Sequence, residues 1–326
     1  MIPPLISILT PTYNHERFIG ECIESVLSQT YPSWEQIIVD DGSADGTAEV
    51  VAGYDDDRIR FIKQENVGIW RLGETYNKAL RVSSGKFIAI LEGDDFWPDH
   101  KLERQMPAFD RPGVVVSFGR AAITDSVGKV LGVYPKDLRP FMDMPEVGAL
   151  KTLLFQNPIT ACTAMCRKDA LLSIGGFKQP RKVPYVDGPT WLDLSLVGKF
   201  QPLDEILGCY RQHGMQVTST MRSDMVDASE YVLEFFSKLS PDVRSHLGIK
   251  AEDLVANIDR KRADKFYFSG RAALKAGRWS DAESDFKRAL TKGSASVKAK
   301  AILGLACGMC RTDMEGIIAM AKRGRP

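Results

Sequence analysis

The sequence predicts an α/β protein: a mostly parallel sheet between helices, followed by an all-α C-terminal appendage. Two observations support this fold class. Short β-rich runs alternate with segments of helical periodicity through the first half of the chain, and such alternation is typical of a parallel sheet covered on both faces. From Asp224 onward the pattern is helical throughout.

Length and composition describe a globular protein. The chain has 326 residues, of which 44% are hydrophobic and 26% charged, and its formal net charge is +1. This balance gives no electrostatic reason to expect nucleic acid as a partner. The six scattered cysteines favour reduced thiols in a cytoplasm. The N-terminus lacks the basic start of a signal peptide, and no apolar run approaches the roughly 20 residues of a membrane span.

The first half of the sequence alternates regularly between the two kinds of element. The expected strands are 5–10, 35–39, 59–62 and 87–91, and the expected helices are 16–29, 47–54 and 73–82. Pro11 is expected to stop the first strand, and Tyr31-Pro32 to end the first helix, because proline disfavours a helical residue before it. The short apolar runs fit strands that are buried on both faces.

The second half is less regular. We expect helices at 101–109, 150–155, 168–173 and 190–197, and strands at 112–118, 160–165 and 203–211. Glycine and proline recur through 119–150, which favours loops and a short hairpin there. A flexible polar run, 216–223, then leads to the helical region.

Polar and acidic side chains follow three of the expected strands. They lie at Thr10–Asn14, Asp40–Asp41 and Glu92–Asp95. Ligands of open parallel sheets bind outside the carboxyl ends of the strands, so these groups are expected to converge. Clustered carboxylates attract a cation, and Mg²⁺ and Mn²⁺ take oxygen ligands and bridge to phosphates. A metal–diphosphate site is therefore predicted; the alternative for the last cluster is an acidic turn that caps the next helix.

The ordered set of motifs resembles that of family-2 glycosyltransferases with the GT-A fold. The matching segments are 7–14, 25–32, 38–43, Asn66-x-Gly68, Gly93-Asp94-Asp95, Gly175-Gly176-Phe177, Asp187 and Tyr210-Arg211-x-His213. The resemblance implies a Rossmann-like sheet, with residues 1–105 as the nucleotide-sugar-binding half and 106–223 as the acceptor-binding half. It also implies inversion at the anomeric carbon.

The same resemblance implies substrates and cofactors. The donor is expected to be a nucleotide sugar, with UDP as the expected carrier, and the metal to be Mn²⁺ or Mg²⁺. The acceptor is expected to be a hydroxyl of a saccharide or lipid-linked saccharide, in the synthesis of cell-surface polysaccharide or glycan. A cytoplasmic enzyme is expected, with peripheral contact to the inner face of the membrane as a further expectation.

The resemblance assigns the nucleotide base to the N-terminal motifs. Pro11, Thr12 and Tyr13 are expected to line the base pocket. Asp41 is expected to accept a hydrogen bond from the uracil ring N–H, because a buried carboxylate in that place needs a donor. The alternative for Asp41 is a helix cap, which Ser43 or Asp45 could supply instead.

Further residues are implied at the reacting end of the donor. Asp95 is expected to bind the metal ion, Asp94 to face the ribose or the metal, and His213 to contact the phosphate or the metal. Arg71 is the candidate for the diphosphate, because its guanidinium is a fixed positive fork. Asp187 is expected to be the general base, ionised with an ordinary pKa near 4 in a loop before a helix. Its alternative is an N-cap.

The chain departs from the family pattern in three places. Glu92 stands where Asp is common, which leaves open which carboxylate touches the metal. Tyr76 stands where a basic residue is common, and Val186 replaces an acidic residue before Asp187. Two other functions stay open: a nucleotidyltransferase, which would usually carry a Gly-rich basic loop that Thr10–Asn14 lacks, and a non-catalytic nucleotide-sugar-binding scaffold.

The C-terminal region, 224–326, has the alternation of small and large residues found in a helix–turn–helix pair. The Gly-Arg-Trp turn at 277–279 divides the pair, which resembles a tetratricopeptide unit. A second, degenerate pair is expected at 296–321, and a plain helical appendage is the alternative. Because the chain ends in Lys322, Arg323 and Arg325, we expect the region to dock a partner protein or the membrane surface.

Overall fold

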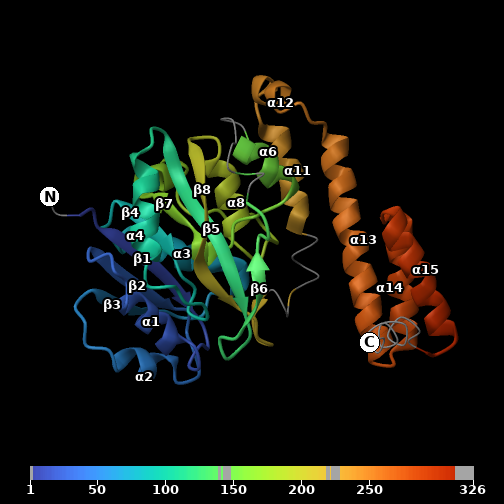
Figure 1. The fold of residues 1–326 in the computed structure, drawn as a ribbon, viewed down its shortest axis with the longest axis horizontal. Coiled ribbons are helices and arrows are strands. Elements are labelled where there is room, and N and C mark those ends of the chain that lie inside the picture. Colours follow the sequence, from blue (N-terminus) through green and yellow to red (C-terminus); the bar gives the residue numbers. More distant parts are fainter. Residues whose placement is uncertain (1–2, 139–140, 142–147, 218–220, 222–227, 313–326) are drawn as a thin grey trace, which may run out of the picture. The chain divides into compact units, whose positions relative to one another are not determined.

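The protein divides into two compact units, residues 1–221 and 222–326 (Figure 1). The computed structural model describes residues 3–138, 141, 148–217, 221 and 228–312. Within these residues the first unit holds every strand, and the second unit is helical. The predicted α/β class and its helical C-terminal region are therefore confirmed. Among the described residues, no helix has both the length and the apolar character needed to cross a membrane.

One sheet of eight strands organises the first unit. Its order is β3-β2-β1-β4-β7-β5-β6, and β8 pairs with β5 outside this path. The strands are β1 Ile6–Thr12, β2 Trp34–Asp40, β3 Ile59–Lys63, β4 Phe87–Ile90, β5 Val114–Thr124, β6 Val130–Tyr134, β7 Met165–Arg167 and β8 Lys199–Arg211. The first four strands are parallel to one another, and β8 is parallel to β5. The pairs β4–β7, β5–β7 and β5–β6 are antiparallel, so the second half is mixed.

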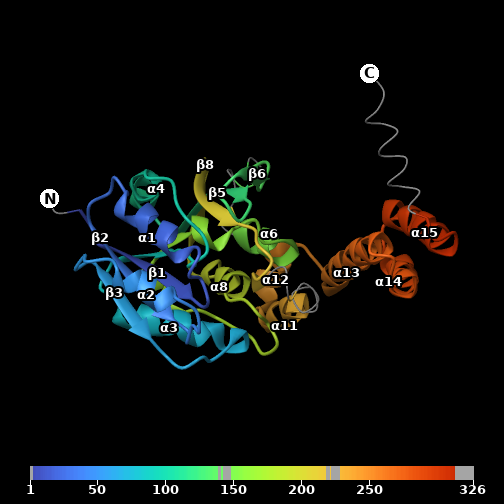
Figure 2. The same ribbon diagram turned by 90° about the horizontal axis from the view of Figure 1, so that it is seen from below.

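Helices cover both faces of the sheet. They are α1 Ile19–Leu27, α2 Thr47–Ala52, α3 Leu72–Val82, α4 Lys101–Gln105, α6 Gly148–Phe155, α7 Lys168–Ser173 and α8 Asp187–Leu194. Short 3₁₀ turns occur at Ile69–Arg71, Met106–Asp110 and Ala161–Thr163. Figure 2 shows α1 and α3 on opposite sides of β1, as expected for a parallel sheet with right-handed crossovers.

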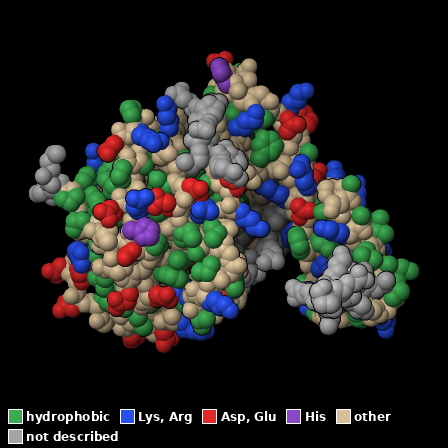
Figure 3. Space-filling view, viewed as in Figure 1, with side chains coloured by type: hydrophobic (Ala, Val, Ile, Leu, Met, Phe, Trp, Pro, Cys, Tyr) green, Lys and Arg blue, Asp and Glu red, His purple; other side chains and the backbone are tan. Residues whose placement is uncertain are grey.

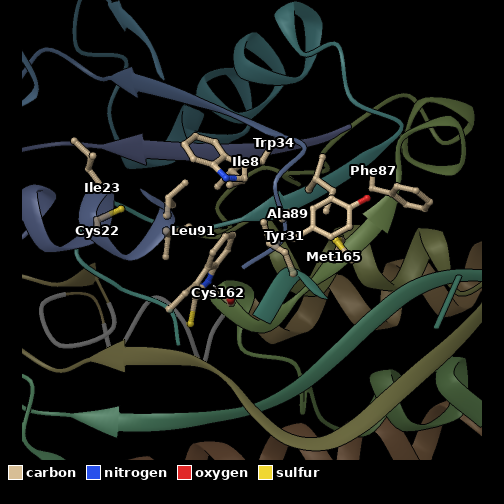
Figure 4. Close-up of a cluster of buried hydrophobic side chains, with 14 of the residues drawn as sticks. Ile8, Cys22, Ile23, Tyr31, Trp34, Phe87, Ala89, Leu91, Cys162 and Met165 are labelled. Carbon is tan, nitrogen blue, oxygen red and sulfur yellow. Dashed lines mark hydrogen bonds between the residues drawn. The ribbon is translucent and has the colours of Figure 1, made fainter. Parts of the chain in front are cut away.

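The core holds the strand ends in register. Figure 4 shows Ile8, Ile23, Trp34 and Ala89 in one buried cluster with Met165, a residue of the second half of the sheet. These side chains are almost completely buried. Each large one stabilises the fold by about 1.5–3 kcal/mol relative to exposure. The core therefore fixes the edge of the sheet at which the carboxyl ends of β1, β2 and β4 meet.

The sequence predicts that the first strand stops at Pro11, and this is wrong. Pro11 pairs with Val39, and Thr12 pairs with Asp40. The ladder between β1 and β4 ends at Leu9 and Ile90, and the carbonyl oxygen of Pro11 accepts from the N–H of Gly93 beyond it. Pro11 thus lies past the end of the β1–β4 ladder, so its missing N–H removes no hydrogen bond of that ladder. Proline is tolerated in such a position.

Two predicted boundaries in the second half are wrong. The strand expected at 160–165 begins only at Met165, because Thr163 donates both its backbone N–H and its hydroxyl to the carbonyl oxygen of Thr160, which closes a 3₁₀ turn before it. The helix expected from Thr190 begins at Asp187. Pro189 then lies in the first helical turn, where a backbone N–H has no intrahelical partner and proline is accepted.

The hairpin expected in 119–150 is confirmed by the antiparallel pair β5–β6. The helix expected at 101–109 is divided at Met106, where α4 passes into a 3₁₀ turn that contains Pro107. In the polar run expected to be flexible, Gln216 is instead buried and its amide donates to the hydroxyl of Tyr210. Residues 218–220 and 222–223 of that run lie outside the described residues.

The second unit contains α11 Tyr231–Lys238, α12 Pro241–Leu247, α13 Ala251–Lys275, α14 Trp279–Lys292 and α15 Ala295–Met309. The predicted helix–turn–helix pair is confirmed as α13 and α14, joined at Gly277 with a φ of 70°. Phe286 of α14 fills the core of this unit, where Gly270 and Gly304 leave room for its ring. The end of the expected second pair and the basic tail lie outside the described residues.

Candidate active site

The turn that follows β4, Glu92–Asp95, lies against the end of β1. A Cβ atom on Gly93 would lie 2.5 Å from Oγ1 of Thr12 and 2.9 Å from Nδ1 of His15. Neither separation is possible for a real side chain without a shift of the surroundings. Gly93 therefore allows the two strand ends to approach this closely.

Asp94 lies beside two histidines. Its Oδ2 is 3.0 Å from Nε2 of His213 and 3.9 Å from Nε2 of His15. Burial by itself raises the pKa of Asp94, but the charge of His15 and the hydrogen bond from His213 outweigh it, and the net shift is downward. The structure thus brings together Asp94 and His213, which are 119 positions apart in the sequence.

A divalent cation bridging to a diphosphate fits this pair. Among the described residues, no group of three or more His, Cys, Asp and Glu side chains is arranged to hold a metal ion. Mg²⁺ in nucleotide sites commonly uses one or two protein carboxylates and completes its shell with phosphate oxygens and water. Asp94 and His213 would supply such a partial set, with the donor supplying the rest.

Asp95, the predicted metal ligand, faces the interior. The residue is 3% exposed, and its Oδ1 accepts a 2.9 Å hydrogen bond from the backbone N–H of Arg211. Its pKa is raised well above the usual value, first by burial and then by the charge of Asp94. Direct metal binding by Asp95 stays a prediction, and its contacts join the turn to β8.

Glu92 is held by α3. Its Oε1 accepts a 2.5 Å hydrogen bond from the hydroxyl of Tyr76, while its Oε2 is buried without a hydrogen-bond partner. Burial is the main cause that raises the pKa of Glu92 to about 7. Two of the three departures from the family pattern, Glu92 and Tyr76, are therefore partners of each other. This contact commits one oxygen of Glu92 to α3.

The burial of Asp41 does not require a hydrogen bond from uracil, so that argument is wrong. Its Oδ1 accepts hydrogen bonds from Nε2 of Gln64 at 2.7 Å and from the N–H of Val67 at 3.0 Å, and its Oδ2 accepts from the N–H of Gly68 at 3.2 Å. The chain itself satisfies this carboxylate, so burial demands no ligand. Recognition of the base by Asp41 stays a prediction that rests on the resemblance. Ser43 caps no helix and donates to Asp40 instead.

The other predicted donor contacts differ in exposure. Pro11 and Thr12 are buried in β1, whereas Tyr13, just beyond the strand, is 47% exposed. Arg71 pairs with Glu74 at 2.6 Å, and both side chains are more than half exposed. Such a surface pair contributes little to stability and is readily exchanged for another partner. A diphosphate contact by Arg71 stays a prediction.

Asp187 begins α8 and is held by a neighbouring amide. Its Oδ2 accepts a 2.7 Å hydrogen bond from Nδ2 of Asn157, whose Oδ1 accepts from the N–H of Ile159 at 3.0 Å. Burial raises the pKa of Asp187, although the N–H of Gly188 and the amide of Asn157 oppose the shift. The expectation of an ordinary pKa is therefore wrong. The carboxylate is oriented, and its raised pKa makes it a stronger proton acceptor.

Arg211 organises the turn that carries Asp94. It is 1% exposed, and its guanidinium lies 5.1 Å from the ring of Phe18 and 4.8 Å from that of Phe96. Its Nε donates to the carbonyl oxygen of Asp94 at 2.9 Å, and its Nη2 pairs with Glu21 at 2.5 Å. Arg211 thus ties α1, β8 and the acidic turn together and acts as a positioning residue.

Sequence reasoning missed three residues of this site. His15 and Asn157 reach Asp94 and Asp187 from loops, and the role of Arg211 is visible only from its contacts. The Tyr-Arg-x-His motif marked the place of Arg211 but gave it no role. Asn157 precedes Pro158, which marks a turn, yet no local pattern indicates which side chain a turn amide will meet.

Comparisons with known sequences bear on most of the first unit. Residues 7–171 match the sequence model of "Glycosyl transferase family 2". The chain is 31% identical over 220 residues to the "Putative teichuronic acid biosynthesis glycosyltransferase TuaG" of Bacillus subtilis, covering 66% of this chain and 82% of that protein. It is 33% identical over 153 residues to the Escherichia coli "UDP-Glc:alpha-D-GlcNAc-diphosphoundecaprenol beta-1,3-glucosyltransferase WfgD", covering 46% and 60% respectively.

Solved structures share the fold. TarS 1-349 from S. aureus in complex with UDP-GlcNAc aligns with a TM-score of 0.59 at 17% identity, covering 94% of this chain and 87% of that one. The mannosyltransferase PcManGT from Pyrobaculum calidifontis, in complex with GDP-Man and Mn²⁺, aligns with a TM-score of 0.57 at 19% identity, covering 94% and 81%. At these identities the likeness concerns the fold alone, and the predicted GT-A architecture is confirmed.

Proposed function

This chain belongs to glycosyl transferase family 2, and on that premise we propose that it transfers a sugar from UDP to an acceptor hydroxyl with inversion. The observation that best supports this reaction is the position of Glu92. After burial, the charges of both Asp94 and Asp187 raise its pKa. The pKa of Glu92 thus responds to the donor-side carboxylate and to the proposed base, which supports our assignment of both to one site.

The donor end of the site has the groups that a leaving diphosphate requires. Asp94 and His213 would hold Mn²⁺ or Mg²⁺, and a bound divalent cation neutralises the charge that develops on the diphosphate as the sugar–phosphate bond breaks. Arg211 keeps Asp94 in place through the carbonyl oxygen of that residue. The chain thus fixes its own ligands before a donor arrives, which lowers the cost of ordering them.

The acceptor end has a positioned base. As the acceptor oxygen attacks the anomeric carbon, Asp187 takes the hydroxyl proton. Asn157 fixes the orientation of the carboxylate. Attack from the face opposite the leaving diphosphate inverts the anomeric centre. The nucleotidyltransferase alternative is set aside because the chain belongs to a glycosyltransferase family.

The names of relatives suggest the kind of acceptor. TuaG is named for teichuronic acid biosynthesis and WfgD for a diphosphoundecaprenol-linked sugar. We extend this to the chain as a proposal: the acceptor is a saccharide or lipid-linked saccharide used in a cell-surface polysaccharide, reached at the inner face of the membrane. The helical second unit is proposed to dock a partner protein or that surface.

The test is the release of UDP. Purified protein is incubated with UDP-glucose or UDP-N-acetylglucosamine and Mn²⁺, and free UDP is quantified with and without EDTA. We expect slow hydrolysis of at least one donor, lost in EDTA. Donors that bind in calorimetry but never release UDP, with or without added glycosides, would favour the non-catalytic scaffold.

A further inference from the structure

An aromatic side chain of the β5–β6 hairpin adjoins the residue that holds the proposed base. Tyr134, the last residue of β6, donates its hydroxyl to the backbone carbonyl oxygen of Asn157 at 3.0 Å. The side chain of the same Asn157 donates to Asp187 at 2.7 Å. One residue therefore connects the ring of Tyr134 to the carboxylate of Asp187.

Tyr134 is anchored through its hydroxyl and is still partly exposed. Although its hydroxyl is engaged, Tyr134 is 43% exposed. Burial, followed by the charge of Asp187, raises the pKa of Tyr134, which agrees with a covered hydroxyl near the base. Because the hydroxyl is pinned, the ring has little rotamer freedom left to lose when a ligand covers its face.

The strand that carries Tyr134 is an edge of the sheet, with β5 as its neighbour in the strand order. Two of its other residues, Val130 and Leu131, are 58% and 59% exposed. Figure 3 shows hydrophobic side chains (green) gathered at the surface over β5 and β6. The hairpin therefore presents apolar surface beside the acceptor half of the site.

We propose that the exposed face of Tyr134 is an acceptor subsite that stacks against a sugar ring. This inference rests on the proposed glycosyl transfer. A pyranose presents C–H groups on its ring faces and hydroxyls at its rim, so an aromatic face receives the former while the rim stays free for polar groups. With its ring on Tyr134, an acceptor sugar can point a rim hydroxyl toward Asp187. The subsite selects a cyclic saccharide over a simple alcohol.

The test measures glycoside binding directly. Methyl β-D-glucopyranoside, methyl β-D-galactopyranoside and methyl N-acetyl-β-D-glucosaminide are added to the full chain with UDP and Mn²⁺, and saturation transfer is followed by NMR. We expect transfer to be strongest at the C–H protons of one ring face for at least one glycoside. Glycerol, a polyol without a ring, is the ligand control and is expected to show none.

Three variants distinguish the loss of ring stacking from a loss of folded structure. Tyr134→Ala is expected to weaken glycoside binding by about tenfold. Tyr134→Phe keeps the ring and is expected to retain most of the affinity. Leu172→Ala, at an exposed leucine of α7 outside the hairpin, is expected to bind as the unmodified chain does. Thermal melting confirms that each variant is folded.

Three results would overturn the proposal. They are the absence of transfer to every glycoside in the unmodified chain, equal binding by Tyr134→Ala, and a loss in Tyr134→Phe as large as in Tyr134→Ala, which would assign the effect to the hydrogen bond with Asn157. UDP release by the unmodified chain is recorded separately. Its absence would count against glycosyl transfer itself, whatever the glycosides do.

Discussion

Replacement of Gly93 by alanine tests whether the close approach of two strand ends builds the donor site. The new methyl group would lie 2.5 Å from Oγ1 and 2.8 Å from Cβ of Thr12, and 2.9 Å from Nδ1 of His15. Ordinary van der Waals contact begins at 3.4 Å, so the turn must move away by about an ångström. Overpacking of this kind costs about 1–3 kcal/mol.

The same shift should reach the ligand pair. Asp94 follows Gly93 directly, and its carboxylate lies 3.0 Å from His213. A displacement of about an ångström takes Asp94 out of line with His213, so we expect the affinity for UDP with Mn²⁺ to fall by about tenfold to a hundredfold. The free energy of unfolding should fall by the overpacking cost of about 1–3 kcal/mol.

Calorimetry of UDP binding with Mn²⁺, together with urea unfolding, measures both effects. Gly132→Ala is the matched control, because a Cβ at Gly132 meets nothing within 4 Å. Gly132→Ala should leave UDP affinity unchanged. If Gly93→Ala binds UDP as tightly as Gly132→Ala does, the strand ends are not packed as described and the reasoning fails.

Three further predictions concern other parts of the molecule. Asp41→Ala should weaken UDP far more than it weakens free diphosphate; equal losses in calorimetry would remove Asp41 from base recognition. Lys101 is buried, and burial lowers its pKa from 10.5 to about 7. Between about pH 7 and pH 10.5 the unfolded chain therefore binds more protons at Lys101 than the folded chain does. The free energy of unfolding should rise with pH across that range. Lys101→Met should flatten the rise in urea titrations, and an unchanged slope would contradict the assignment. Gly304→Ala places a Cβ 2.4 Å from Cζ of Phe286, so it should lower the melting temperature of the second unit while UDP affinity stays unchanged; loss of both would tie the two units together energetically.

Local pattern was sufficient for most of the sheet. Period and composition located β1 to β4 and the carboxylates at their ends, because a buried parallel strand is a short apolar run that stops at a polar loop. The boundary errors arose where a local rule was outweighed. Pro11 continues β1 because the pairing of β1 with β4 has already ended there. Thr163 closes a turn with its own side chain.

The hydrogen-bond partners of the site residues could not be predicted from the sequence. Gln64 satisfies Asp41 from 23 positions away, and Asn157 holds Asp187 from 30 positions away. Such pairs depend on how the strands are ordered in the sheet. The prediction of an ordinary pKa for Asp187 failed for the same reason, because the burial of Asp187 depends on packing that no local pattern contains.

The account depends most directly on Asp187 as the base. Asp187→Asn keeps the shape of the side chain but removes the proton acceptor, so the rate of UDP release should fall by about two to four orders of magnitude. UDP affinity should not change, because Asp187 is proposed to act on the acceptor and not on the nucleotide. Asp169→Asn is the matched control, since Asp169 also lies in the first turn of a helix but is exposed and accepts a hydrogen bond from the next backbone N–H.

The decisive measurement is the pH profile of UDP release by the unmodified chain and both variants, with UDP binding recorded alongside. Activity should fall as the pH drops through the pKa of Asp187, which burial places above its ordinary value. Asp169→Asn should reproduce this profile, and the residual rate of Asp187→Asn should lack the acidic limb. Near-normal turnover in Asp187→Asn, or loss of UDP binding with it, would contradict the account and move the base to another residue, with Asp193 and His213 the next to test.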